Sequence, residues 1–473
     1  MSGDFELIDR PREAHRHAIG LTRRELVQVG YSGLLGLGVP SLWAGQAAAG
    51  TLARRTGKAK SVVLIFLTGA PSHLDTFDLK PEAPVEIRRE FKAISTKVAG
   101  VTYCEHLPGL SARADKLAVI RSMTHGLPSH EHATHMMLTG IDVLPPGSTH
   151  MASRADWPCF ASGLDFVHPR QDGIPSGVNL PTYLNNGYGF SGQNAGVLGP
   201  KFDPWHIKQD PNESGFRVED LSLPVGLTAE KIGRRQALLA EIEHQTCAID
   251  REGSGRAFTG IQDKAFTMLT SGLVKRAFEI DREDPRLRDR YGRHSFGQSL
   301  LLSRRLIQAG VPIVQANMGR MNNWDTHTDN CRQLKTRLLP PLDQAVSAFL
   351  DDLDAHGLLE ETLVVMVGEF GRTPKIGQSS VNDPNHRTGR DHWAGVFSAL
   401  FAGGGVRGGQ MIGRSDKIGA YPATRGYYPS DLGATIYRAL GITPASEVRD
   451  QLGRPLQLNR GEPIAALFDG SAA

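Results

Sequence analysis

Continuous apolar runs recur along the chain, separated by stretches in which apolar residues return every three or four positions. Each run is bounded by turn residues, and a run of this kind is typical of a strand buried on both faces of a sheet. The runs are Ser61–Leu67, Leu117–Arg121, Ile313–Asn317, Leu363–Val367 and Val396–Phe401.

Helical spacing fills the segments between these runs. Phe296–Ala309 has an apolar face and precedes Gly310, a natural helix stop, and the apolar face from Leu342 to Leu353 is closed by Gly357. Near the end of the chain, Ser430 is expected to cap a helix that extends through Leu440. Strand and helix in alternation predict an α/β fold, a three-layer α/β/α sandwich with a mostly parallel central sheet.

The middle of the chain breaks this pattern. Residues 151–220 are rich in Pro, Gly, Asn and aromatic residues, while 228–245 and 257–280 have helical spacing. We interpret residues 151–290 as a loop-rich and helical insertion in one domain that spans residues 56–460.

The first 50 residues have the order of an export signal. Arg23-Arg24 precedes a weakly apolar stretch, Val27–Trp43, and the small residues Ala47–Ala49 follow. This order predicts a signal for the bacterial twin-arginine machinery, and hence a periplasmic or extracellular protein. A single membrane anchor is the alternative, but about 17 residues broken by glycines and Pro40 are at or below the length needed to span a bilayer. We expect no stable transmembrane segment after signal removal.

Composition narrows the class further. With 53 Lys+Arg and 50 Asp+Glu in 473 residues, the net charge of +3 gives no general attraction to nucleic acid. Four cysteines without a C-x-x-C pair exclude a disulfide scaffold and a thiolate zinc ribbon. Their spacing does not decide between buried thiols and one disulfide.

Carboxylates and histidines gather in the loops next to the predicted strands, where an open parallel sheet carries its active residues. Carboxylate oxygen and imidazole nitrogen together form the ligand set of zinc, manganese or iron, and oxygen-rich variants suit calcium. The five segments are Gly69–Asp78, Ser122–His135, Asn322–Asp329, Gly368–Thr373 and Gly389–Trp393.

Single members of this set have ordinary explanations. Asp75 could cap a turn, Asp325-x-His327 is a common spacing, and His392 could pack beside Trp393. Four histidines from His125 to His135 far exceed what 17 histidines in 473 residues predict for so short a segment. The combination therefore favours a metal centre more strongly than any one residue does.

The order of these motifs closely resembles the secreted "domain of unknown function 1501" proteins, which are sulfatase-like in fold. The resemblance covers residues 56–460, and this family is similar in turn to the alkaline phosphatase/sulfatase superfamily. The matching blocks are GAPSHLDTFDLKP, WDTH, VGEFGRTP, GRDHW and YPSDLGATIYRALG.

The resemblance implies a site at the carboxyl edge of an alkaline-phosphatase-like sheet, holding one or two divalent ions such as zinc, manganese, calcium or iron. Phe370 stands where the superfamily has a ligand, and no cysteine occupies the nucleophile position, so standard sulfatase chemistry is not expected. The implied metal ligands are Asp75, Asp325, His327, Glu369, Asp391 and His392. The implied catalytic residues are Ser129, His130, His132 and Arg372, with Thr124 as a second hydroxyl and a metal-bound hydroxide as the other attacking group.

Two functions follow from this set, and a purely structural exported protein without a metal is the third possibility. The first is an exported metal-dependent hydrolase of phosphate or sulfate esters, acting on a small-molecule or polysaccharide ester. The second is a non-catalytic, metal-containing protein that binds a glycan or an anionic polymer, for which the loop Leu184–Asn194 offers amides and aromatic rings.

Overall fold

The computed structural model describes residues 59–144, 151–218, 272–319, 322–378 and 388–470, together with Lys231, Arg234 and Leu238. The predicted export signal and the predicted helix 228–245 lie outside these residues, apart from those three single positions. Of the predicted helix 257–280, the described part contains α9 (Gly272–Ala277). No helix in the described ranges is both long and apolar enough to cross a membrane.

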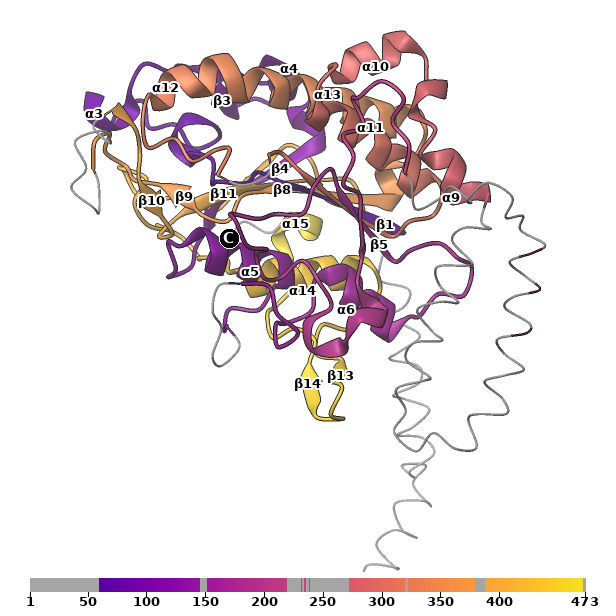
Figure 1. Ribbon diagram of the computed structural model, residues 1–473. Coiled ribbons are helices and arrows are strands. Elements are labelled where there is room, and N and C mark those ends of the chain that lie inside the picture. The colour runs from indigo at the N-terminus through magenta and orange to yellow at the C-terminus, as the bar shows by residue number, and fades with distance from the viewer. Residues whose placement is uncertain are drawn as a thin grey trace, which may run out of the picture. The chain divides into compact units, whose positions relative to one another are not determined.

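A mixed sheet of eight strands forms the centre of the described fold (Figure 1). Seven strands run in one direction, and β11 runs against both of its neighbours, β4 and β8. The strand order is β12 (Gln410–Ile412), β4 (Leu117–Met123), β11 (Phe397–Ala402), β8 (Thr362–Val367), β1 (Ser61–Phe66), β7 (Ile313–Asn317), β5 (Gly177–Leu180) and β6 (Trp205–His206). The prediction of a mostly parallel sheet is confirmed, with β11 as the exception.

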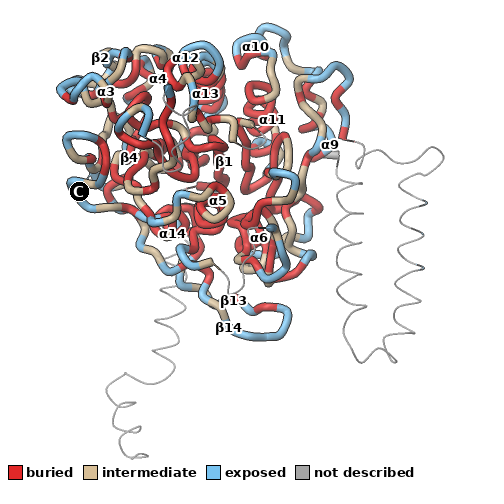
Figure 2. The backbone as a smooth tube through the Cα atoms, turned by 60° about the vertical axis from the view of Figure 1, so that its left-hand side comes forward, coloured by how far each residue is buried: buried red, intermediate tan, exposed pale blue. Residues whose placement is uncertain are grey.

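The central strands are buried on both faces, as their continuous apolar sequences predict. Successive side chains of a strand point to opposite faces, so Val63 and Ile65 of β1 join one core cluster while Leu64 and Phe66 join the other. The tube in Figure 2 is accordingly red through β1 and β4. Helices must therefore cover both faces of the sheet.

Helices on each face complete the three layers (Figure 1). One core cluster includes residues of α4 (Pro108–Ser111), α9, α10 (Pro285–Tyr291), α11 (Ser295–Gln308), α12 (Asn330–Gln333) and α13 (Leu339–Ala355). The other includes residues of α5 (His130–Thr139), α6 (Phe160–Val167), α14 (Pro429–Ala439) and α15 (Ala466–Asp469). The predicted α/β/α architecture is thus confirmed.

Short helices and strand pairs lie outside the main sheet and its covering helices. Among the described residues, one π-helical turn joins α12 to α13, and three two-stranded pairs lie outside the main sheet. These elements are α3 (Val85–Arg88), the π turn Leu334–Leu338, and the strand pairs β2 (Ala93–Ser95) with β3 (Thr102–Cys104), β9 (Gly371–Arg372) with β10 (His392–Trp393), and β13 (Glu447–Arg449) with β14 (Pro455–Gln457).

Two local expectations are corrected or resolved by the structure. The last long helix begins at Pro429 and not after Ser430, because the N-cap is Tyr428, whose N–H donates to the Asp431 carboxylate at 3.0 Å. The described cysteines, Cys104, Cys159 and Cys331, are buried free thiols.

Candidate functional site

The chemistry-bearing loops meet at one edge of the sheet because of the strand directions. β1, β4, β7 and β8 all run the same way, so the loops that follow them leave from the same edge. β11 runs the other way and begins with Phe397 beside Met123, the last residue of β4. Residues 388–396, which precede β11, therefore reach this edge as well.

The carboxylate of Asp325 is the point on which the site converges. Its Oδ2 lies 3.2 Å from Nε2 of His130, and its Oδ1 lies 2.9 Å from Nε2 of His327 and 3.3 Å from Nε2 of His392. The Nε2 atoms of His327 and His392 are 3.1 Å apart. Arg372 completes the group, with Nη2 at 2.5 Å from Asp325 Oδ1.

The other ring nitrogen of His130 and of His392 faces an acceptor. His130 Nδ1 lies 2.6 Å from Glu369 Oε1, and His392 Nδ1 lies 2.9 Å from the carbonyl oxygen of Pro128. A carbonyl oxygen only accepts hydrogen bonds, so the proton of a neutral His392 is on Nδ1. Burial lowers the pKa of His392, which favours this neutral form. Its Nε2 is then left as a lone pair that faces Asp325.

Asp391 orients the remaining ring in the same way. Its Oδ1 lies 3.4 Å from Nδ1 of His327 and accepts the backbone N–H of His392 at 2.8 Å. The three histidines of the site therefore turn their Nε2 atoms toward Asp325 and their Nδ1 atoms outward. Acceptors on the outer nitrogens are the usual way in which proteins orient metal-binding imidazoles.

The charges of the site leave a negative excess. Glu369 and Asp391 are buried, the side chain of Asp325 is 12% exposed, and the guanidinium of Arg372 contacts Asp325. Burial alone would raise the pKa of Asp325, but Arg372 and the hydrogen bonds from His130 and His327 hold that pKa well below its ordinary value. Burial would lower the pKa of His130, but Asp325 and Glu369 outweigh it and raise that pKa to about 9. When all three imidazoles are deprotonated, as metal binding requires, the net charge of these groups is −2, which matches one divalent cation.

This donor set fits a bound metal ion. Two three-residue groups have ligand atoms within 4.8 Å of one another: His130, Asp325 and His392, and His327, Asp391 and His392. Three imidazole nitrogens and a carboxylate are ligands that suit zinc, manganese or iron. Glu369 Oε2 is buried and has no hydrogen-bond partner, as expected of a group placed for a cation or its ligands.

Two glycines allow the loops to approach so closely. Gly69 has φ +99°, and a Cβ there would lie 2.6 Å from the backbone of Asn322 and 2.7 Å from that of Trp324. A Cβ at Gly389 would lie 2.0 Å from the carbonyl group of His327. Side chains at either position would push apart the loops that carry the site.

Phe370 forms an apolar wall of the site. Its ring centroid lies 5.0 Å from that of His130 and 4.9 Å from that of His392, and the side chain is fully buried. Phe370, which the resemblance places at a ligand position, thus packs against two imidazoles.

Asp75, predicted as a metal ligand, lies outside the two groups described above and is paired with an arginine. Its carboxylate accepts hydrogen bonds from Arg390 at 2.7 and 3.2 Å and from Asn330 at 2.9 Å. Asp75 and Arg390 are both fully buried, and Arg390 also donates to backbone carbonyl oxygens, including that of Ile87 at 2.7 Å. Sequence reasoning gave Arg390 no role, because a buried ion pair is recognised only once both partners are placed.

Arg372, predicted as a catalytic residue, donates its hydrogen bonds to other groups of the protein. Nε donates to the carbonyl oxygen of Ala70 at 2.8 Å, Nη1 to that of Arg390 at 3.3 Å, and Nη2 to that of Gly69. The guanidinium is 0% exposed. The arrangement makes Arg372 a residue that positions Asp325 and the loop after β1.

Ser129 and its neighbours form a hydrogen-bonded chain beside the site. Ser129 is the N-cap residue of α5, but its hydroxyl does not cap the helix and instead donates to Glu131 Oε2 at 2.9 Å. The Tyr188 hydroxyl donates to Glu131 Oε1, also at 2.9 Å. Sequence reasoning missed Glu131 and Tyr188, although Glu131 is two residues from the predicted Ser129.

The other histidines of the segment from His125 to His135 have partners of their own. His125 Nε2 lies 2.6 Å from the backbone carbonyl of Glu369, and His135 Nδ1 lies 3.1 Å from the Ser191 hydroxyl. Burial lowers the pKa of His135 to about 4. His132 is half-buried in the first turn of α5, outside the two groups that could hold a metal. Helical spacing separates His132 and His135 from His130, while His125 precedes α5.

The amides of the loop Leu184–Asn194 are largely committed to its own structure. Gln193 is 0% exposed, accepts the N–H of Leu184 and donates to the carbonyl oxygens of Leu184 and Phe190. Asn194 donates to the Tyr183 hydroxyl at 2.9 Å. These two amides stabilise the loop and are not displayed for a ligand.

Comparison with protein-family models shows to which family this chain belongs. A family model described as "Protein of unknown function (DUF1501)" matches residues 59–468. The chain belongs to the DUF1501 family. The match confirms the family predicted from the sequence blocks and agrees closely with the predicted range of residues 56–460.

Similar solved structures include sulfatases and an alkaline phosphatase. The PsFucS1 sulfatase from Pseudoalteromonas sp. is 11% identical with a TM-score of 0.38, and the match covers 84% of this chain and 71% of that one. The alkaline phosphatase from the Antarctic bacterium TAB5 is 14% identical with a TM-score of 0.34, over 81% and 98% of the two chains. The lipoteichoic acid synthase LtaP from Listeria monocytogenes is 12% identical with a TM-score of 0.36, over 86% and 76%.

Likeness at this level transfers none of these activities to the DUF1501 protein. Comparison with curated protein sequences gives no match. The function of this chain therefore has to be argued from its own site.

Proposed function

We propose that this DUF1501 protein is an exported, metal-dependent hydrolase of phosphate or sulfate esters. The observation that carries the proposal is the convergence of three imidazole Nε2 atoms on the partly buried Asp325 carboxylate at the carboxyl edge of the sheet. A divalent ion bound there would polarise an ester oxygen and lower the pKa of an attacking group. The export component rests on the Arg23-Arg24 signal pattern.

In this proposal Asp325, His130, His327 and His392 hold the metal ion. Their Nε2 and carboxylate oxygen atoms already lie within 3.3 Å of one another in the pairs described above. Glu369 and Asp391, expected from the family resemblance to be ligands, instead orient His130 and His327 from the outer side. Asp75 remains the partner of Arg390.

Ser129 is the hydroxyl that we propose as nucleophile. It adjoins His130, and Glu131 Oε2 at 2.9 Å is placed to accept its proton. A bond would form from Ser129 Oγ to phosphorus or sulfur as the ester bond to the departing alkoxide breaks, and water would protonate that alkoxide and later release the seryl ester. Thr124 is less suited, because its hydroxyl donates to the carbonyl oxygen of Gly395 at 2.9 Å.

The proposed activity is tested by turnover on a panel of phosphate and sulfate esters. We expect hydrolysis by the full-length chain, loss of hydrolysis after chelation, and recovery when zinc or manganese is returned. The Ser129→Ala variant should lose turnover but keep its metal. Metal binding without turnover on any ester would contradict the hydrolase and favour the alternative, a metal-containing binding protein for glycans or anionic polymers.

Glu369 should set the metal affinity without holding the ion. Its Oε1 accepts the N–H of Gly69 at 2.8 Å and faces His130 Nδ1 at 2.6 Å. The Glu369→Gln substitution keeps the shape but weakens the charged partner of the imidazole, so we expect metal affinity to fall about 10–100-fold. Competition titration against a chromogenic chelator measures this.

The exposed carboxylate of Glu360 provides the matched control. Glu360→Gln should leave metal affinity within twofold of the unsubstituted protein. An unchanged metal affinity in Glu369→Gln would show that the imidazole of His130 needs no carboxylate partner to bind metal. Complete loss of bound metal in the folded variant would identify Glu369 as a ligand.

A further inference from the structure

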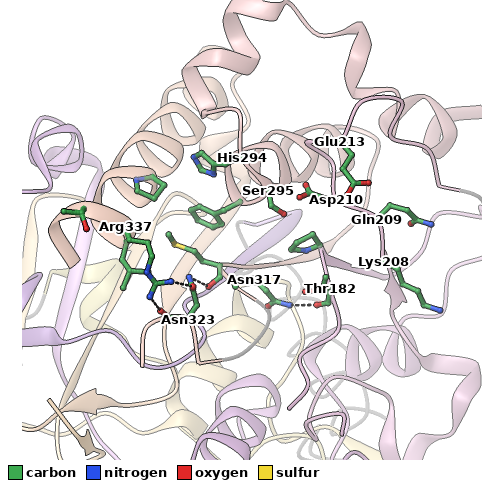
Figure 3. A pocket seen from close by; sticks show the side chains of 17 residues that line it. Thr182, Lys208, Gln209, Asp210, Glu213, His294, Ser295, Asn317, Asn323 and Arg337 are labelled. Atoms are coloured by element: carbon green, nitrogen blue, oxygen red, sulfur yellow. Dashed lines mark hydrogen bonds between the residues drawn. The ribbon is translucent and has the colours of Figure 1, made fainter. Parts of the chain in front are cut away.

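A cavity opens at the same sheet edge as the metal centre. It has a volume of about 950 Å³ and lies at the carboxyl ends of β5 and β7, next to the first turn of α11 (Figure 3). Thr182 follows β5, Asn317 is the last residue of β7, and Ser295 begins α11. This volume is near the upper end of the range of about 300–1,000 Å³ for small-molecule pockets.

The cavity adjoins the metal centre through one loop. Asn323 lines the cavity, and Asp325, on which the three histidines converge, is two residues further along the chain. Two residues span at most about 7 Å between Cα atoms. The Cα atoms of Asn323 and Asp325 are therefore close together, which places this wall of the cavity near the metal centre.

The charges of the cavity cancel, unlike those of the metal centre. Lys208 and Arg337 contribute two positive charges, and Asp210 and Glu213 contribute two negative charges. His294 also lines the cavity, and burial lowers its pKa, so it adds no charge near neutral pH. Charge complementarity therefore favours a neutral group here, beside the centre that would take the charged ester group.

The lining offers both donors and acceptors, and part of it is held rigidly. The Asn317 amide donates to the carbonyl oxygen of Thr182 at 3.0 Å, and Arg337 donates to the side-chain and backbone oxygens of Asn323 at 2.9 and 3.0 Å. Figure 3 shows both contacts as dashed lines, with Asp210 on the neighbouring segment. Fixed polar groups lose little entropy when a ligand binds.

Apolar side chains complete the wall of the cavity. Phe296 and Met318 line it together with the amides and carboxylates. A sugar ring matches this combination, because it presents hydroxyl groups at its edge and C–H groups on its faces, and carries no charge.

We propose that this cavity binds the sugar part of a sugar phosphate or sugar sulfate whose ester group reaches the metal ion that Asp325 would hold. The inference deepens the proposed hydrolase and rests on it for the position of the ester. The carboxylates Asp210 and Glu213 accept hydrogen bonds from sugar hydroxyls in this arrangement.

Paired substrates test the proposal. The Asp210→Ala/Glu213→Ala double variant of the full-length chain is compared with the unsubstituted protein on hexose 6-phosphates and 6-sulfates and on 4-nitrophenyl phosphate. We expect kcat/KM to fall at least tenfold on the best sugar ester and to change less than twofold on the nitrophenyl ester, which has no sugar hydroxyls. Glu82→Ala/Glu360→Ala, which removes two exposed carboxylates elsewhere, should change neither value.

The outcomes distinguish a failure of the proposed sugar site from a failure of the proposed hydrolase. Equal losses on sugar and nitrophenyl esters, or no loss on either, would overturn the sugar site and leave the hydrolase standing. If no ester is hydrolysed, saturation-transfer NMR with the free hexoses decides. Hexose binding that the double variant loses would support the cavity as a sugar site, and absence of binding would overturn it.

Discussion

Replacing Asp325 with Asn is expected to abolish metal binding. The substitution keeps the shape of the side chain but removes the negative charge on which His130, His327 and His392 converge. Metal affinity should therefore fall by more than the roughly 10–100-fold expected for an outer residue such as Glu369. Isothermal titration with zinc and with manganese measures the loss, and any ester hydrolysis should disappear with it.

The same substitution also leaves the buried Arg372 guanidinium without its carboxylate. That change can destabilise the fold, so a second variant is needed. His392→Gln removes one imidazole and leaves the ion pair intact, and it should also lose metal affinity. His168→Gln, at an exposed histidine, is the matched control and should bind metal normally. Normal metal binding by folded Asp325→Asn would contradict the site.

Replacing Asp75 with Asn is expected to cost stability and not metal. Arg390 is 0% exposed and would keep its charge without a partner carboxylate, a change that costs about 3–5 kcal/mol in comparable buried pairs. Chemical denaturation measures the free energy of unfolding. The metal content of the remaining folded protein should be unchanged, because Asn330 and Arg390 occupy the Asp75 carboxylate.

The pH dependence of stability should show the same ion pair. Burial would raise the pKa of Asp75, but the charge and hydrogen bonds of Arg390 outweigh it and lower that pKa below its ordinary value. The stabilisation is therefore present above the pKa of the unfolded chain and is lost as the pH falls through the folded pKa. Asp75→Asn should flatten this part of the stability profile.

A double-mutant cycle completes this test. Asp75→Asn combined with Arg390→Gln removes both charges and should recover part of the lost stability. If Asp75→Asn instead keeps its stability and loses metal, Asp75 is the ligand that the family resemblance implies.

The layered fold could be read from the sequence because its strands are continuous apolar runs. Ser61–Leu67 and Leu363–Val367 lie side by side in the sheet as β1 and β8, each buried on both faces. The direction of β11 could not be read in this way, since an apolar run has the same appearance in either direction. That direction explains why His392 precedes its strand while Asp325 follows β7.

The site was predictable to the level of its loops and not to the level of each side chain. Asp325, His327 and His392 lie in one cluster because the strand edges bring their loops together. Asp75 lies on an equally suitable loop, but Arg390, far away in sequence, pairs with its carboxylate. Such long-range pairing depends on packing that local patterns do not contain.

Elemental analysis of the full-length protein, purified without chelators and without a histidine tag, tests the central claim most directly. The arrangement of three imidazoles around Asp325 predicts at least one equivalent of a divalent transition metal per chain in the folded protein. A protein that contains no metal, and takes up no zinc, manganese, calcium or iron when these are added, would contradict the metal centre and the hydrolase built on it.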